Sequence, residues 1–354
     1  MLAKNKPIYT HNMGLTESEF LRREFSLTLT ELTESVEEQI IKSDLFYIAT
    51  ANPHELKSLL ENCKSEGAVI FFFGNETYDI PQFQWLNKYS SKIKFAFIYN
   101  LPRKTPFKIT LRCLIGALVD GGLFLWNRER NIFRNFKNGI DLMRRTRKLT
   151  IDFPHLDFPQ GYSRRFVAEI KIAGINIGEN SILDRGPMVA SLKSKKIGFV
   201  GQNGSWCREL AIKVLTKKNI GFVPTFTKGW SGANQGALTT YIDSLVQSEL
   251  TLNPPGNLTN RTHRYIESLI FNSLPIMPPS TLQDPHLWGV WSEGSGSRYF
   301  SWKRQINHAL KLSLRERELI ILNALLKEKE KVQNINDILN NIDQFLEKEF
   351  GNAK

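Results

Sequence analysis

The sequence predicts an α/β protein with two parallel-sheet units followed by a helical tail. Apolar strands alternate with amphipathic helices between residues 44 and 99, and a second alternation runs from residue 195 to residue 277. Residues 303–354 are highly charged and carry apolar stripes at helical spacing. We therefore expect a Rossmann-like unit over residues 1–185, a second one over residues 186–302, and a helical tail over residues 303–354.

The composition is that of a globular protein that favours anionic partners. The chain has 354 residues, of which 41% are hydrophobic and 23% charged, and its formal net charge is +12. The three cysteines, Cys63, Cys113 and Cys207, have no zinc spacing and indicate a reducing compartment. No stretch reaches the ~18 apolar residues of a membrane span, so we expect a cytoplasmic protein.

In the first unit, continuous apolar runs predict strands that are buried on both faces. The pattern predicts helical structure over residues 16–41, 53–67 and 80–91, with Gly67 ending the second stretch, and strands over residues 44–50, 68–76 and 92–102. A strongly basic run follows at residues 130–149. It is either a solvated face or a surface that meets anionic lipid or an acceptor.

The second unit repeats this alternation. We expect strands over residues 195–201, 220–226, 249–255 and 274–279, with helices over residues 206–219, 237–248 and from Arg264 onward. Ligands of such sheets bind beyond the carboxyl ends of the strands. Gly201 and Asn203 lie in the first of the loops at that edge, and Arg208 lies one turn into the next helix, where an anion could bind.

Arg264 and Glu267 are three residues apart and therefore project from one face of the helix that follows the Pro254-Pro255-Gly256 turn. An arginine near a helix N-terminus can hold a phosphate, and a carboxylate one turn later can accept hydrogen bonds from two sugar hydroxyls. This pair suits a nucleotide-sugar, in which a diphosphate is joined to a ribose. The alternative is a surface ion pair that contributes a few tenths of a kcal/mol.

A catalytic base and a metal site are harder to find in the sequence. Glu76 closes a predicted strand, where its carboxylate could act as a general base on an acceptor hydroxyl or could simply be a loop charge. No clustered histidine and acidic signature predicts a metal, so we expect no metal and no other cofactor.

Residues 241–277 resemble the carboxyl-terminal domain of exostosin-like glycosyltransferases, which include the relatives of ribitol xylosyltransferase. The family pattern is Ser-x-φ-x-Leu-x-Pro-x-Gly (φ is an apolar residue), then Arg-x-φ-Glu-Ala-Leu, then Pro-Val-Ile. This chain has Ser248–Gly256, then Arg264-Tyr265-Ile266-Glu267-Ser268-Leu269, then Pro275-Ile276-Met277. Phe158–Tyr162 is similar to a Pro-φ-Gly-Tyr element of the family, and Gly74-Asn75-Glu76 resembles its Ser/Gly-Asp-Glu.

The resemblance implies a GT-B fold, in which two Rossmann-like domains face each other and the carboxyl-terminal one binds the donor. It implies that Glu267 binds the donor ribose and that Arg264 and Arg208 lie near the diphosphate. Ser268 and Asn75 depart from the family pattern, so the pattern does not fix the donor sugar or the base. The animal relatives carry a membrane anchor, which this sequence does not show, so we expect a cytoplasmic enzyme that builds a surface polysaccharide. We expect a nucleotide-sugar, a glycan or lipid-linked acceptor and peripheral membrane contact as its partners, and no nucleic acid.

Two other interpretations stay open at this point. Charge and aromatic content alone are compatible with a nucleic-acid-binding protein, although no nucleic-acid-binding signature is present. A catalytically inactive GT-B scaffold that binds a partner through its helical tail would have the same pattern. The sequence does not give the oligomeric state.

Overall fold

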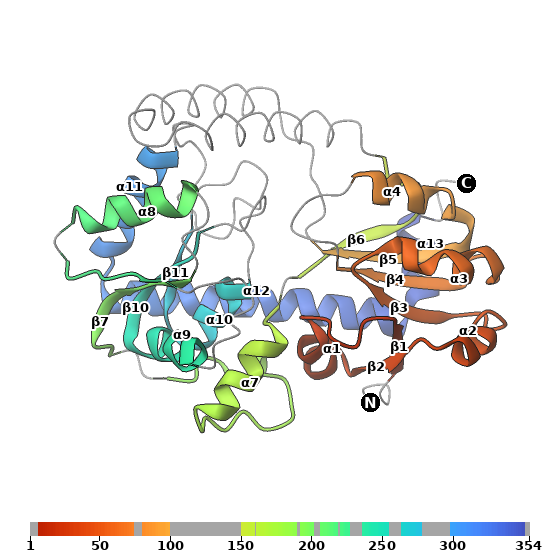
Figure 1. Cartoon of the computed structure of the whole chain (residues 1–354), viewed down its shortest axis with the longest axis horizontal. Coiled ribbons are helices and arrows are strands. Elements are labelled where there is room, and N and C mark those ends of the chain that lie inside the picture. The colour runs from red at the N-terminus through yellow and green to blue at the C-terminus, as the bar shows by residue number, and fades with distance from the viewer. Residues whose placement is uncertain are drawn as a thin grey trace.

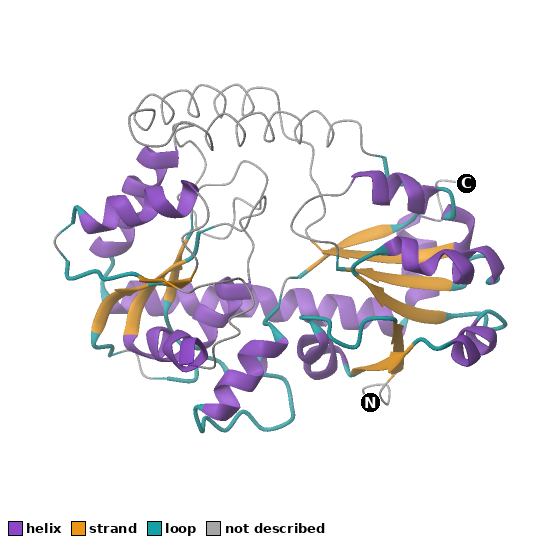
Figure 2. Cartoon of the chain, viewed as in Figure 1, coloured by secondary structure: helices purple, strands orange, loops and turns teal. Residues whose placement is uncertain are grey.

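The computed structural model describes most of the chain as an assembly of parallel sheets and helices (Figures 1 and 2). The described residues are 6–73, 80–99, 150–159, 161–189, 192–201, 206–218, 220–226, 236–254, 263–277 and 298–350. Among them, no helix combines the length and the apolar character needed to cross a membrane.

The first sheet has six parallel strands in the order β2-β1-β3-β4-β5-β6. The strands are β1 (Lys6–Thr10), β2 (Leu27–Glu31), β3 (Phe46–Thr50), β4 (Ala68–Phe72), β5 (Ile93–Tyr99) and β6 (His155–Phe158). The helices of this region are α1 (Ser18–Phe25), α2 (Glu34–Ile40), η1 (Pro53–Leu56), α3 (Lys57–Asn62), α4 (Ile80–Asn87) and η2 (Ser90–Lys92).

Both faces of this sheet are buried, as its continuous apolar strands require. Val69 and Phe71 of β4 belong to the apolar cluster on one face, while Ile70 and Phe72 belong to the cluster on the other. Successive strand residues point to opposite faces, so an apolar residue at every position indicates that helices cover both of them. The predicted parallel sheet is therefore confirmed for strands β3, β4 and β5.

The second sheet is smaller, with three parallel strands in the order β11-β10-β7. Its strands are β7 (Lys195–Gly198), β10 (Ser248–Leu252) and β11 (Leu274–Ile276), and the short strands β8 (Val200–Gly201) and β9 (Thr225–Phe226) pair with each other beside it. The helices are α7 (Arg164–Ile172), η3 (Leu183–Arg185), α8 (Trp206–Thr216), α9 (Gly236–Gln247) and α10 (His263–Ile270).

One apolar cluster extends through both sheets. Tyr162 lies against Phe166 of α7, and Phe166 makes an edge-to-face contact with Phe271 after α10, with ring centroids 5.6 Å apart. Helix α7 packs against both α1 and α9. The segment between the two sheets thus contributes β6 to the first sheet and α7 to the shared core.

The predicted helical tail is confirmed as α11 (Arg298–Lys311), α12 (Leu314–Asn340) and α13 (Ile342–Phe350). Helix α12, blue in Figure 1, runs behind both sheets. Arg317 in its first turn pairs with Glu249 of β10 at 2.6 Å, and Asn336 in its last turns donates to the Glu24 carbonyl at 2.9 Å. At the end of the tail, Phe345 of α13 packs edge-to-face on Phe95 of β5.

Three expected elements differ from the structure. Residues 16–41 are not continuously helical, because Ser26 takes a left-handed conformation that ends α1 and the chain then forms β2. The helix expected to end at Gly67 already ends at Asn62, since Cys63 is extended. Of the strand expected over residues 220–226, only Thr225 and Phe226 pair with a neighbour.

Candidate functional site

The first turn of α10 lies beside the carboxyl ends of strands β5 and β6 of the first sheet and of the short strand β8. Tyr99, the last residue of β5, stacks on the His263 ring with centroids 6.4 Å apart and planes inclined by 18°. Nδ1 of His263 lies 3.2 Å from the carbonyl of Gly161, which follows β6. Because ligands of open parallel sheets bind beyond the carboxyl ends of strands, this junction is the candidate site.

Glu267 is buried at this junction, and both of its carboxylate oxygens accept hydrogen bonds. Its side chain points from α10 towards Ser163, whose backbone N and Oγ donate to Oε1 at 3.1 and 2.7 Å. The hydroxyl of Tyr241 on α9 donates to Oε2 at 2.7 Å. Glu267 is only 4% exposed, so these donors replace water around the buried charge.

Tyr241 and Ser163 are fixed in these roles by their own surroundings. Burial, with the nearby charge of Glu267, raises the pKa of Tyr241 well above its usual value, so the hydroxyl remains a donor. Ser163 is also the N-cap of α7, because its Oγ accepts from the backbone N of Phe166 at 3.1 Å. The capping hydroxyl thus connects the start of α7 with the carboxylate on α10.

Arg264 lies on the same helix face and extends to the end of β8. One of its terminal nitrogens donates to the Val200 carbonyl at 2.7 Å, and its guanidinium carbon lies 5.3 Å from the Phe199 ring centre and 5.5 Å from that of Tyr241. Such contacts with aromatic rings orient a guanidinium. Its Nε is buried without a hydrogen-bond partner among the described residues.

Gly201 permits this position of the guanidinium. A Cβ atom added at Gly201 would lie 3.1 Å from a terminal nitrogen of Arg264 and 3.2 Å from Cζ of Phe199. The glycine therefore provides the space in which the guanidinium approaches the backbone at the end of β8.

His263 completes the junction as a charged group. Burial disfavours the protonated ring, but the hydrogen bond and the charge of Glu17 raise the pKa of His263 to about 9. Nε2 lies 3.5 Å from a carboxylate oxygen of Glu17, which directly precedes α1. The imidazolium and Glu17 thus form an ion pair between the first turn of α10 and the loop after β1.

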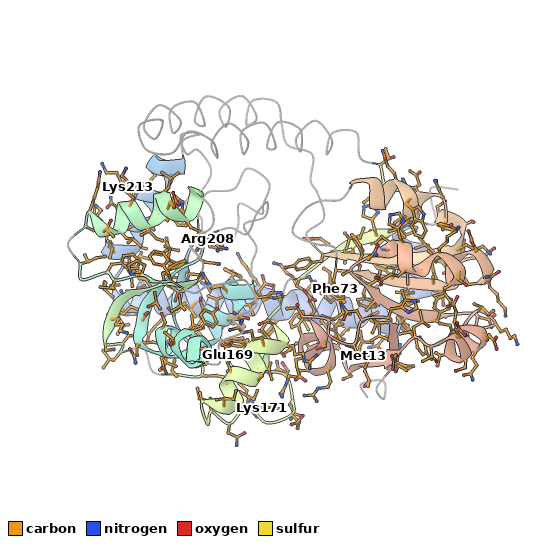
Figure 3. All side chains as sticks on the ribbon, in the orientation of Figure 1. Met13, Phe73, Glu169, Lys171, Arg208 and Lys213 are labelled. Atoms are coloured by element: carbon orange, nitrogen blue, oxygen red, sulfur yellow. The ribbon has the colours of Figure 1, made fainter. Side chains whose placement is uncertain are left out.

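The structure brings three of the predicted site residues together: Gly201, Arg264 and Glu267. Arg208 is half-buried and lies at the end of α8 that faces the middle of the molecule (Figure 3). Glu76 and Asn203 lie outside the described residues, as does the basic run at 130–149. The alternative of a surface ion pair between Arg264 and Glu267 is not observed, since both side chains contact other partners.

Four residues of the junction were not predicted from the sequence: Glu17, Ser163, Tyr241 and His263. Ser163 has a usable signal, because a serine before the amphipathic stretch at residues 164–172 is a typical helix N-cap. Tyr241 and Glu17 have none, since only the packing of α9 and α1 brings them to α10.

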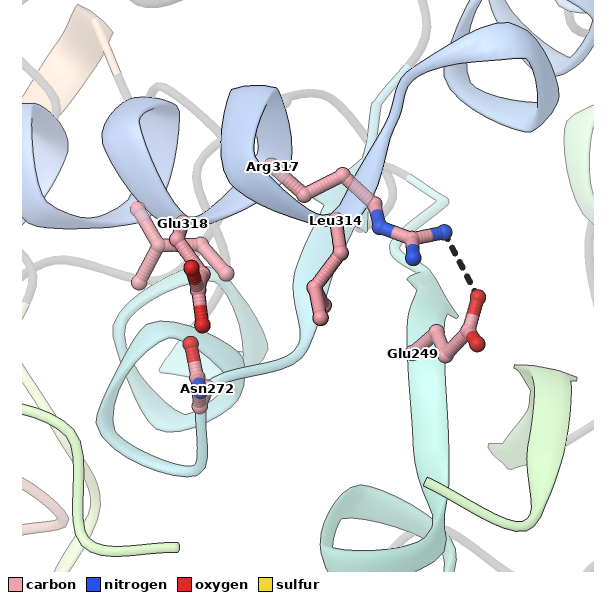
Figure 4. A pocket seen from close by; sticks show the side chains of 6 residues that line it. Glu249, Asn272, Leu314, Arg317 and Glu318 are labelled. Carbon is pink, nitrogen blue, oxygen red and sulfur yellow. Dashed lines mark hydrogen bonds and ion pairs between the residues drawn. The ribbon is translucent and has the colours of Figure 1, made fainter. Parts of the chain in front are cut away.

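The structure also has a hollow under α12, but this hollow is not a good candidate site. It is lined by Glu249, Asn272, Leu314, Arg317, Glu318 and Ile321 (Figure 4). Glu249 lies near the amino end of β10, the end opposite to the one where ligands of such sheets bind. Its carboxylate is already paired with Arg317 and with Lys196, each at 2.6 Å.

Comparisons with known proteins give no match: no family model, curated protein or solved structure matches the chain. Within the described part of the chain, no three histidine, cysteine or acidic side chains cluster as metal ligands would. The functional argument therefore depends on the chemistry of the junction itself.

Proposed function

We propose that the protein is a glycosyltransferase of the GT-B type, which moves a sugar from a nucleotide-sugar to a hydroxyl of a glycan or related acceptor. The observation that carries this proposal is the junction at α10. A guanidinium, a helix N-terminus and a buried carboxylate lie together beside the carboxyl ends of β5 and β8.

In this proposal Arg264 and the first turn of α10 hold the diphosphate. Aromatic rings and the Val200 carbonyl orient the guanidinium before any ligand arrives, so little reorganisation is needed when negative charge develops on the leaving group. Fixed donors of this kind stabilise a departing diphosphate without a metal ion. Arg208 on α8 is a further candidate for the same anion.

Glu267 would bind the ribose of the donor. An ionised carboxylate has about four lone-pair positions, and Ser163 and Tyr241 supply three donors. A ribose hydroxyl could use the remaining position, and a second one could take the place of the Tyr241 hydroxyl. Glu76, from the resemblance, remains the candidate base for the acceptor hydroxyl, and polysaccharide synthesis in the cytoplasm, peripheral to a membrane, remains the proposed setting.

A ligand panel tests the proposal directly. UDP-, GDP-, CMP- and dTDP-sugars are added to the purified protein, and its unfolding temperature is measured with each. We expect one class to stabilise the protein, by about 2.7 kcal/mol at a hundred times its dissociation constant. Slow hydrolysis of the same donor, measured by the release of the nucleoside diphosphate (or of CMP from a CMP-sugar), provides an activity measurement that needs no acceptor.

Two conservative variants connect binding to the junction. Arg264→Lys keeps the charge but loses the planar fork, and Glu267→Gln keeps the size but loses the charge. Both should lose the ligand-induced stabilisation, whereas Arg304→Ala, an exposed change on α11, should not. Wild-type hydrolysis by Glu267→Gln would reject the assignment, as would salt-sensitive nucleic-acid binding without any response to nucleotide-sugars.

A further inference from the structure

An exposed leucine stripe on α12 is unusual among the described residues. Leu319, Leu322 and Leu326 are 51%, 44% and 55% exposed. Their spacing of three and four residues places them on one face of the helix. The other exposed large apolar side chains are scattered over the molecule: Met13, Ile172, Leu192, Val223 and Phe226.

The opposite face of α12 is already used by the protein itself. Ile321, Leu325, Val332 and Ile335 are buried in the core that the helix covers. The leucine stripe is therefore not needed to hold α12 on the body. A contiguous apolar stripe on an exposed face marks an interaction surface.

Charges beside the stripe show which partner fits it. A two-fold axis normal to α12, midway between Leu322 and Asn323, would relate position 319 to 326 and position 315 to 330. In an antiparallel pair of α12 helices, Leu319 therefore meets Leu326 of the second copy, and Arg315 meets Glu330.

Arg315 and Glu330 lie at opposite ends of the stripe, so opposite charges meet at both ends of this interface. Every one of these pairs occurs twice in a two-fold dimer, because such an interface is self-complementary. A parallel arrangement would instead place Arg315 against Arg315 and Glu330 against Glu330.

We propose that the exposed face of α12 is the interface of an antiparallel, two-fold homodimer, with Leu319, Leu322 and Leu326 at its centre. Arg315 and Glu330 are both exposed, and the described structure contains no ion pair for either one. The contact of two helices over about four turns is smaller than a standard interface of ~1,600 Å². The dimer is accordingly reversible, with a dissociation constant in roughly the micromolar range.

Sedimentation velocity of the full chain from about 1 to about 100 µM tests the proposal. The wild type shifts from monomer to dimer over this range, and Leu322→Asp remains monomeric. Leu192→Asp, at a more exposed leucine outside α12, retains the wild-type shift. A wild type that stays monomeric throughout, or a Leu192→Asp effect equal to that of Leu322→Asp, would overturn the proposal.

Charge reversal tests the antiparallel geometry specifically. Arg315→Glu alone places two glutamates together at each end of the stripe, and Glu330→Arg alone places two arginines together, so each variant dimerises at least several-fold more weakly. The double variant and an equimolar mixture of the two single variants restore opposite charges at both ends. Dimerisation should return in both, and its failure to return in either would exclude this arrangement.

The same stripe could instead contact a membrane, and vesicles distinguish that outcome. The protein is mixed with vesicles of phosphatidylcholine and phosphatidylserine and sedimented. Binding that is lost in Leu322→Asp, together with a monomeric wild type, would replace the dimer with a lipid surface. The dimer predicts no effect of Leu322→Asp on vesicle binding.

Discussion

Gly161 shows how one residue holds the junction in place. Its φ is +56°, and a Cβ added there would lie 2.3 Å from the Phe20 ring. Gly161→Ala should therefore destabilise the protein by more than about 3 kcal/mol, because backbone strain adds to a steric clash. Gly174→Ala is the matched control, since Gly174 also has a positive φ but has open space around it, and it should cost only about 1 kcal/mol. Equal losses of unfolding free energy in the two variants, measured by urea denaturation, would contradict this account.

Glu169 on α7 makes stability depend on pH. Burial, opposed by Arg165 and reinforced by the charge of Glu267, raises the pKa of Glu169 to about 7. One of its carboxylate oxygens is buried without a hydrogen-bond partner in the described structure. The folded state thus binds its proton more tightly than the unfolded state, and stability is lost as the pH rises from about 4.5 to about 7.

Glu169→Gln should remove this dependence. The variant has no charge to bury, so relative to wild type it should gain up to about 3 kcal/mol of unfolding free energy between pH 4.5 and pH 8. Denaturant titrations at several pH values measure the difference. If the difference in unfolding free energy between wild type and Glu169→Gln is constant across this pH range, Glu169 is not the titrating group.

Glu267 also differs from a surface residue in what its removal does. Truncation to alanine leaves the hydroxyls of Ser163 and Tyr241 buried without their acceptor, which should cost about 1–3 kcal/mol. An alanine variant would therefore lose stability as well as activity, and the glutamine variant is the better test of function.

At the scale of elements, α12 begins with a complete capping box. Ser313 Oγ accepts from the backbone N of Glu316, and the Glu316 side chain accepts from the backbone N of Ser313. Ser313→Ala should lower the free energy of unfolding by about 1 kcal/mol, because a first-turn N–H loses its acceptor. Chemical denaturation measures this, and the far-UV spectrum should be unchanged. A free energy of unfolding equal to or above that of the wild type would show that the capping box does not stabilise the protein.

The elements that could be predicted are those whose burial produces a continuous apolar run in the sequence. Strands β3 and β4 are fully apolar runs because helices cover both of their faces. Strand β2 is an edge strand in which only Leu27 is buried, so it forms no apolar run and its segment was included in a predicted helix. Strand β1 was missed because its five residues include a lysine and a proline and form no apolar run.

At the scale of the whole molecule, an ion pair that titrates joins the loop after β1 to the first turn of α10. Glu17 raises the pKa of His263 above its ordinary value of 6.5 to about 9, so the pair contributes stability below about pH 6.5 that is lost as the pH rises through about 9. Glu17→Gln should flatten the fall in stability between pH 6.5 and pH 9. The pKa of the ring, measured by NMR, should drop towards its ordinary value in the same variant, and an unchanged pKa would exclude Glu17 as its cause.

The candidate site could be predicted only in part, and distance along the chain explains why. Arg264 and Glu267 share a helix face at fixed spacing, so the sequence is enough to pair them. Ser163 and Tyr241 reach Glu267 only after α7 and α9 have packed on the second sheet. Local sequence patterns do not indicate contacts between residues that are far apart in the chain. The hydrogen-bond partners of the Glu267 carboxylate could therefore be identified only from the structure.

The contact between Phe95 and Phe345 affects how the protein matures on the ribosome. Phe95 is completely shielded in the finished molecule, yet Phe345 emerges about 250 residues later. At a synthesis rate of ~5–20 residues per second, Phe345 is added on the order of 10–50 s after Phe95. The Phe95 ring lacks this packing partner during that time. Truncated chains that end before residue 342 lack α13 and should therefore aggregate or bind chaperones. Complete burial of the first sheet thus depends on the last residues to be synthesised.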